Sequence, residues 1–189
     1  GHGVPGAFMT LIATGALDNA LNEVVHGQVG ALVQRLHQVV QITLGQHGEG
    51  SESDDGMELG VCYLDGEMSK VVFAGARFEL HLVENGMIST IKGTKSGIGY
   101  HGIPHDQYFE EHEIILLDGK SFYMTSDGLT DQVGGENNRM FGKKRFQKIL
   151  TEVETLPMAE QKERIWQELK KYQSNQNRRD DIAVVGFKI

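Results

Sequence analysis

Three dipeptides typical of tight turns divide the middle of the sequence into short apolar runs. They are Asp65-Gly66, Asn85-Gly86 and Asp118-Gly119, and each lies between two runs that are rich in aliphatic and aromatic residues. Three antiparallel hairpins between residues 59 and 125 would leave little room for the long crossovers that parallel strands need. We therefore expect this part of the chain to form antiparallel sheet.

Helical periodicity appears on both sides of this segment. Residues 29–44 carry apolar side chains at three- and four-residue steps, and a looser apolar face runs from Phe8 to Val25. Two further helical segments are predicted around residues 146–153 and 157–172, and residues 182–189 form a last apolar strand. This order of elements predicts an α+β layered domain rather than a doubly wound α/β fold.

Composition limits the classes of function. The chain has 189 residues, which suits one domain, and a net charge of −8 argues against an extended nucleic-acid interface. No stretch has the roughly 18 apolar residues of a membrane span, and Cys62 is the only cysteine, so a cytoplasmic setting fits. Because the chain begins at Gly1 without a Met or a signal peptide, we interpret it as a piece of a longer protein.

Two acidic motifs lie at the ends of apolar runs. Asp127 follows the run of residues 122–125 and precedes Gly128, while Asp180 and Asp181 directly precede the last strand. If the two strands are neighbours, these carboxylates converge, and such hard oxygen ligands suit Mg²⁺ or Mn²⁺. The other interpretation is a turn at Asp127-Gly128 and a solvated strand entry at Asp180-Asp181, which spacing alone favours.

Several segments together resemble the PPM superfamily, the protein phosphatase type 2C proteins, and most of all its bacterial branch typified by the stage II sporulation phosphatase E (SpoIIE-like). The resemblance is carried by Gly-His-Gly-Val-Pro-Gly-Ala-Phe-Met at residues 1–9, Thr-Ser-Asp-Gly-Leu-Thr-Asp at 125–131 and Arg-Arg-Asp-Asp-Ile-Ala-Val-Val at 178–185. Residues 74–76 and 138–146 look like further elements of this branch. The resemblance implies an antiparallel β-sandwich flanked by helices in αββα layers.

The resemblance also implies a site for two divalent cations, Mg²⁺ or Mn²⁺. Asp127 and Asp180 match the metal ligands, Gly128, Asp181, Gly1 and His2 would lie beside the metals, and no other catalytic residue is implied. A bridging Asp of the family would lie about three residues before Gly1. On this interpretation residues 1–189 are a single catalytic domain that lacks its first strands and the upstream ligands on which its activity depends.

The implied activity is hydrolysis of phosphoserine or phosphothreonine by a water that the two cations activate. In this branch the substrate resembles an anti-sigma-factor antagonist, and the catalytic domain often belongs to a membrane-anchored sensor. Arg139, Lys143 and Lys144 could contact such a substrate, or could simply be the solvated start of a helix.

Two further possibilities remain open, and a third is discounted. The domain could be a non-catalytic module that binds a phosphoprotein, and the two N-terminal helices could form a homodimer. A haloacid-dehalogenase-like phosphatase also has Asp-Gly after a strand, but it needs a nucleophilic Asp where this chain has Thr125.

Overall fold

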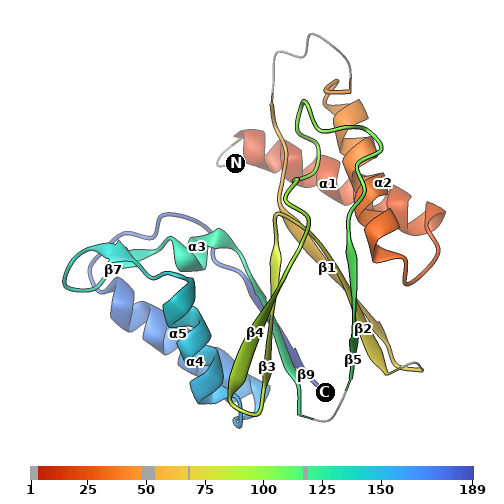
Figure 1. Ribbon diagram of the computed structural model, residues 1–189. Coiled ribbons are helices and arrows are strands. Elements are labelled where there is room, and N and C mark those ends of the chain that lie inside the picture. Colours follow the sequence, from red (N-terminus) through yellow and green to blue (C-terminus); the bar gives the residue numbers. More distant parts are fainter. Residues whose placement is uncertain (1–3, 48–53, 68, 117–118) are drawn as a thin grey trace. The chain divides into compact units, whose positions relative to one another are not determined.

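Figure 1 shows the computed structural model of the chain, which describes residues 4–47, 54–67, 69–116 and 119–189. The chain divides into two compact units, of which the first comprises residues 1–79 and 92–116 and the second comprises residues 80–91 and 117–189. Each unit combines helices with an antiparallel sheet, so the prediction of an α+β fold is confirmed. That the chain is a single catalytic domain stays a prediction.

The first unit packs two helices on a three-stranded sheet. The helices are α1 (Val4–Glu23) and α2 (Val29–Thr43), and the strand order is β1 (Leu59–Asp65), β2 (Lys70–Ala76), β5 (Glu111–Ile115). The predicted apolar stripe of α2 is buried with β2 in one core, where each large apolar side chain contributes about 1.5–3 kcal/mol. The core residues of α2 and β2 are Val29, Leu32, Val33, Leu36, Val40, Val72, Ala74 and Ala76.

The polar face of α2 holds the loop that precedes β5. Gln34, Gln38 and Gln41 lie four and three residues apart, so their side chains share one face of the helix. Their amide groups donate hydrogen bonds to backbone carbonyls of the loop, between residues 100 and 107, at 2.8–3.3 Å. These bonds satisfy carbonyls that a loop without regular structure would otherwise leave unpaired.

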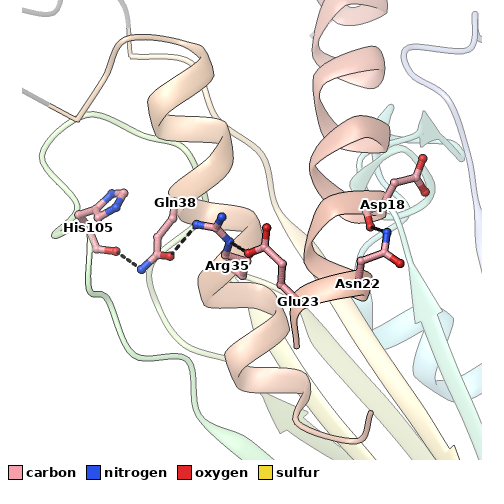
Figure 2. Close-up of polar contacts among 6 residues, drawn as sticks. All are labelled: Asp18, Asn22, Glu23, Arg35, Gln38 and His105. Carbon is pink, nitrogen blue, oxygen red and sulfur yellow. Dashed lines mark hydrogen bonds and ion pairs between the residues drawn. The ribbon is translucent and has the colours of Figure 1, made fainter. Parts of the chain in front are cut away.

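Figure 2 shows how this polar face continues to α1. Gln38 donates to the carbonyl of His105, and Arg35 donates through Nη1 to Gln38 (3.4 Å) and through Nε to Glu23 near the end of α1 (2.6 Å). On α1 itself, the Asn22 amide donates to the carbonyl of Asp18 (2.8 Å). Arg35 on α2 therefore links the end of α1 to Gln38, which in turn holds the loop.

His37 is the buried centre of the same face. The backbone N–H of Gly99 donates to its Nδ1 (3.0 Å), so the ring hydrogen is on Nε2, which donates to the carbonyl of Pro104 (3.0 Å). Burial lowers the pKa of His37 below its ordinary value; the bond to Pro104 opposes the shift, and electrostatic repulsion from the neighbouring His105 adds to it. The neutral ring is thus the form that fits this site.

The second unit packs helices against a four-stranded antiparallel sheet. The strand order is β4 (Met87–Lys92), β3 (Glu79–Glu84), β6 (Ser121–Thr125), β9 (Val184–Lys188). The helices are α3 (Asp127–Thr130), α4 (Lys143–Val153) and α5 (Met158–Gln173), and a small hairpin joins β7 (Val133–Gly134) to β8 (Arg139–Met140). The core holds side chains from β6, α3, α4 and α5.

A buried glutamine fastens the helices of this unit to its sheet. The Tyr123 hydroxyl on β6 donates to the side-chain oxygen of Gln161 on α5. The Gln161 amide donates to the carbonyls of Glu154 (3.3 Å) and Leu156 (2.8 Å) in the α4–α5 connection. All the polar atoms of this buried side chain therefore have partners, as a buried amide requires.

Two of the three predicted hairpins are confirmed and the third is wrong. Asp65 pairs with Lys70 at the end of the β1–β2 hairpin, and Asn85-Gly86 joins β3 to β4 with positive φ at both residues (53° and 73°). The runs around residues 118–119 instead enter different sheets, because β5 pairs with β2 while β6 pairs with β3 and β9. A turn dipeptide indicates a reversal of the chain but does not specify the pairing partner.

Cys62 lies half-buried on β1, where burial raises the pKa of its thiol to about 11. The thiol is therefore neutral at physiological pH and is no candidate nucleophile or metal ligand. None of the helices in the described part of the chain combines the length and the apolar character that crossing a membrane would need.

We predict that His37 makes the protein less stable below pH 6.5. Because its pKa in the folded state lies below its ordinary value of 6.5, the unfolded chain takes up the proton first. The free energy of unfolding should then fall with decreasing pH, by at most about 1.4 kcal/mol per pH unit from this group. Chemical denaturation between pH 5 and 8, of the wild type and of His37→Gln, measures the effect.

The exposed His26 provides the control for this comparison. His26→Gln should keep the pH dependence of the wild type, whereas His37→Gln should have a shallower slope below pH 6.5. Equal slopes in the wild type and His37→Gln would contradict the assignment.

Candidate metal centre

The pairing of β6 with β9 sets the position of both acidic motifs. The strands run antiparallel and end with Thr125 opposite Val184, so the C-terminal end of β6 lies beside the N-terminal end of β9. Asp127 follows β6 and Asp180 precedes β9, at the same edge of the sheet. The two strands are therefore neighbours, which is the condition for the carboxylates to converge; that convergence stays a prediction.

Ser126 extends the contact between the two segments beyond the paired strands. Its N–H donates to the carbonyl of Ala183 (3.0 Å), and its Oγ donates to the carbonyl of Asp181 (3.1 Å) and accepts from the N–H of Ala183 (3.0 Å). A side chain thus continues the ladder where regular pairing stops. These bonds fix Ser126, the residue before Asp127, against the segment that contains Asp181.

Gly128 brings the two motifs into direct contact. A Cβ at this position would lie 2.2 Å from the carbonyl oxygen of Asp181 and 3.3 Å from the Cβ of Asp180. Only a hydrogen fits at the first distance, so the close approach of the two segments requires glycine here. The structure therefore brings Gly128, Asp180 and Asp181 together.

The carboxylates themselves differ in exposure. Asp127 and Asp181 are exposed, and Asp180 is half-buried with its Oδ1 accepting the N–H of Asp181 (2.7 Å). The backbone of Asp127 is fixed because its carbonyl accepts from the N–H of Asp131 (2.8 Å) and from the Thr130 hydroxyl (3.1 Å). Rigid backbone with accessible carboxylate oxygen is what a hard cation needs from its ligands.

The donor set fits Mg²⁺ or Mn²⁺ but is incomplete. Asp127 and Asp180 supply carboxylate oxygens from neighbouring strand ends, whereas no group of three or more His, Cys, Asp or Glu able to hold a metal occurs among residues 4–47, 54–67, 69–116 and 119–189. A cation held by these two aspartates would need water, or ligands outside these residues, at its remaining coordination positions. Gly1 and His2, predicted to lie beside the metals, are outside the described residues.

The predicted substrate-binding residues come shortly after Asp127 in the sequence. Arg139 lies on β8, Lys143 and Lys144 begin α4, and all three are exposed. Their segment is tied to α3, because the N–H of Gly142 donates to the carbonyl of Thr130 (2.8 Å). Their contact with a substrate stays a prediction.

Sequence reasoning missed the residues that hold the site together. Ser126 stands where a helix N-cap is common, which was the available signal. Gln132 gave none, because a glutamine in a polar stretch looks like a surface residue. It is nevertheless buried, and its amide donates to the carbonyls of Val133 (3.0 Å) and Asn177 (3.1 Å), which fixes the segment leading to Asp180.

Comparisons with known proteins agree with these observations. The whole chain, residues 1–189, matches the model of the family described as Stage II sporulation protein E (SpoIIE). No match was found among curated proteins.

The fold resembles several solved phosphatase structures. The SiaA-PP2C domain of Pseudomonas aeruginosa is 31% identical, with a TM-score of 0.87 over 100% of this chain and 72% of that one. The PP2C phosphatase domain of SpoIIE from Bacillus subtilis, with a fragment of its regulatory domain, is 15% identical, with a TM-score of 0.72 over 100% of this chain and 52% of that one. The RsbU and RsbW domains of a Mycobacterium tuberculosis protein are 16% identical, with a TM-score of 0.75 and coverages of 100% and 49%.

This chain therefore spans about half the length of the last two structures, whose likeness shows the fold alone. The fold is the one that the resemblance implied. The family model matches the whole of this chain, and a relative with 31% identity also covers the whole chain. The chain therefore belongs to the SpoIIE family of PP2C-type serine/threonine phosphatase domains.

Proposed function

We propose that this domain hydrolyses phosphoserine or phosphothreonine on a regulatory protein, with Asp127 and Asp180 as ligands of Mg²⁺ or Mn²⁺. The observation that carries the proposal is the seating of Gly128 on Asp181, which holds the two acidic motifs together at one edge of the β6–β9 pair. Because the chain belongs to a phosphatase family, we interpret this pair of acidic motifs as a metal site for phosphate hydrolysis.

When bound, divalent cations lower the pKa of water and neutralise the charge on a phosphoryl group. The residues of the chain supply the conditions for that chemistry. Asp127 and Asp180 offer negative oxygens that retain the cations, and the bridge from Ser126 to Asp181 and Ala183 keeps the two motifs in register. Neither aspartate acts as a nucleophile.

Relatives support the choice of metal and of ligand. A phosphatase domain of SpoIIE from Bacillus subtilis is described as presoaked with Mn, and the PPM Ser-Thr phosphatase MsPP from Mycobacterium smegmatis was solved in complex with cacodylate. Cacodylate is a tetrahedral oxyanion with the shape of a phosphate group. We extend the use of a divalent cation and of a tetrahedral anion from these proteins to this one as part of the proposal.

Arg139, Lys143 and Lys144 are the proposed contacts for the substrate on the phosphoprotein side. Positive side chains near the metal site attract a phosphorylated segment, which carries close to two negative charges at neutral pH. The substrate would be a regulatory protein of the anti-sigma-factor-antagonist kind, in a cytoplasmic signalling system.

We predict that Asp127→Asn and Asp180→Asn abolish turnover in the intact protein. Each change keeps the shape of the side chain but removes the charge that holds a cation, and the lost stabilisation of several kcal/mol corresponds to at least about a hundredfold in kcat/KM. Phosphate release from an aryl phosphate and from a phosphoserine peptide, with Mn²⁺ present, measures the loss. Titration with Mn²⁺ followed by calorimetry should show weaker metal binding in both variants.

The exposed Glu136 is the matched control, because Glu136→Gln removes one negative charge from the β7–β8 hairpin. This variant should turn over substrate at the rate of the wild type. Wild-type rates in Asp127→Asn and Asp180→Asn would overturn the assignment of ligands. The non-catalytic alternative predicts instead that the intact wild type binds a phosphopeptide without hydrolysing it, whatever metal is present.

We also predict that Gly128→Ala weakens both stability and Mn²⁺ binding. The new Cβ would meet the backbone of Asp181, which has to move and thereby separates the two motifs. Overpacking of this kind costs about 1–3 kcal/mol, which thermal unfolding with and without Mn²⁺ will measure. Gly66→Ala is the control, since a Cβ there has no atom within 4 Å; equal losses in the two variants would contradict the role of Gly128.

A further inference from the structure

The positive charge of the chain is concentrated in the unit that holds the candidate metal centre. Residues 80–91 and 117–189 contain 13 Lys and Arg against 12 Asp and Glu, whereas the remainder of the chain contains 5 against 14. The net charges are therefore +1 and −9. An anionic partner would be repelled by the first unit and tolerated or attracted by the second.

Two segments of the second unit contain basic residues and no acidic residue. Residues 137–148 hold Arg139, Lys143, Lys144, Arg145 and Lys148. Residues 169–179 hold Lys170, Lys171, Arg178 and Arg179. All nine of these side chains are exposed, and we call them the basic rim.

Tyr172 joins the two segments into one surface. Its hydroxyl donates to the carbonyls of Arg139 (2.9 Å) and Met140 (3.2 Å), and the guanidinium of Arg145 lies 4.1 Å from the centre of its ring. The Gln176 amide also donates to the side-chain oxygen of Asn138 (2.8 Å). The two groups of cations are therefore neighbours in the folded unit, although they lie about thirty residues apart in the sequence.

The basic rim adjoins the candidate metal centre through both segments. The first segment follows α3, to which the N–H of Gly142 is bonded. The second ends at Arg179, directly before Asp180, and is held there by the bond from Gln132 to Asn177. A phosphorylated residue at the metal centre would thus have its flanking residues next to these cations.

Part of the rim forms a groove of about 520 Å³. Lys144, Arg145 and Lys148 lie on its lining, together with Glu152 and Glu168. Both glutamates have cationic partners, because Lys148 pairs with Glu152 (3.6 Å) and Arg164 pairs with Glu168 (3.3 Å). No carboxylate of the described residues lies within ion-pair distance of Arg139, Lys144 or Arg179.

We infer that the basic rim is a docking surface for the acidic residues that flank the phosphorylated residue of a protein substrate. The inference rests on the proposed function, and it adds a preference for acidic sequence around the phosphate. The complement to a surface rich in exposed cations is a run of carboxylates, and arginine and tyrosine are enriched in protein interfaces. A chain with a net charge of −8 is a poor partner for a nucleic-acid backbone.

The test compares two phosphoserine peptides of equal length, one flanked by Asp and Glu and one flanked by Asn and Gln. Fluorescence anisotropy with the intact protein, without divalent metal, measures their binding. The acidic peptide should bind at least about tenfold more tightly at low salt, and the difference should shrink at high salt. The double variant Lys144→Glu/Lys171→Glu should lose about tenfold in affinity for the acidic peptide.

Lys162→Glu is the control, because Lys162 is an exposed cation of α5 outside both segments. It should keep the preference of the wild type. Equal binding of the two peptides, or an unchanged preference in the double variant, would overturn the inference. Tighter binding of a DNA duplex, or of vesicles of phosphatidylglycerol and phosphatidylcholine, than of the acidic peptide would also overturn it.

Phosphate release from the same peptides with Mn²⁺ is scored separately. An absence of hydrolysis together with preserved binding preference would reject the proposed catalysis and leave the docking surface supported. Hydrolysis of both peptides without any binding preference would support the catalysis and reject the docking surface.

Discussion

Five residue pairs align β6 with β9, from Ser121 opposite Lys188 to Thr125 opposite Val184. This ladder brings together two aspartates that are 53 positions apart in the sequence, because each lies just beyond the same end of the pair. Ser126 and Gly128 then determine how closely the segments beyond the two strands approach each other. Without the ladder, the two aspartates that we propose as metal ligands would not lie at one edge of the sheet.

The site was predictable from sequence where local chemistry decides the structure. An acidic residue at the end of an apolar run is a local signal, so Asp127 and Asp180 could be named as candidate ligands, and Gly128 came with the Asp-Gly motif. The close approach that requires this glycine involves Asp181, 53 positions away, and was not visible in the sequence. The α2 stripe and the Asn85-Gly86 turn are equally local. These elements depend on residues close in sequence, whose spacing is visible without a structure.

Long-range pairing was not predictable in the same way. The sequence around Asp118-Gly119 looks like a third hairpin, but β5 and β6 join different sheets. Gln132 and Tyr172 act through bonds to segments more than thirty residues away, and a polar or aromatic residue gives no sign of such a partner. The same applies to the glutamines of α2, whose partners are backbone carbonyls and therefore carry no sequence signature.

The two units use the same device for different purposes. In the first unit, buried or half-buried amide and imidazole groups bind the carbonyls of a loop and hold it on α2. In the second unit, Gln161 and Gln132 hold the helix connection and the segment before Asp180. Neutral side chains can make such bonds at little desolvation cost compared with charged ones.

The most direct measurement is a crystal structure of the intact protein soaked with Mn²⁺, with the metal located by its anomalous scattering. The account predicts Mn²⁺ coordinated by carboxylate oxygens of both Asp127 and Asp180. Manganese bound at another place, or the two carboxylates directed away from each other, would contradict it.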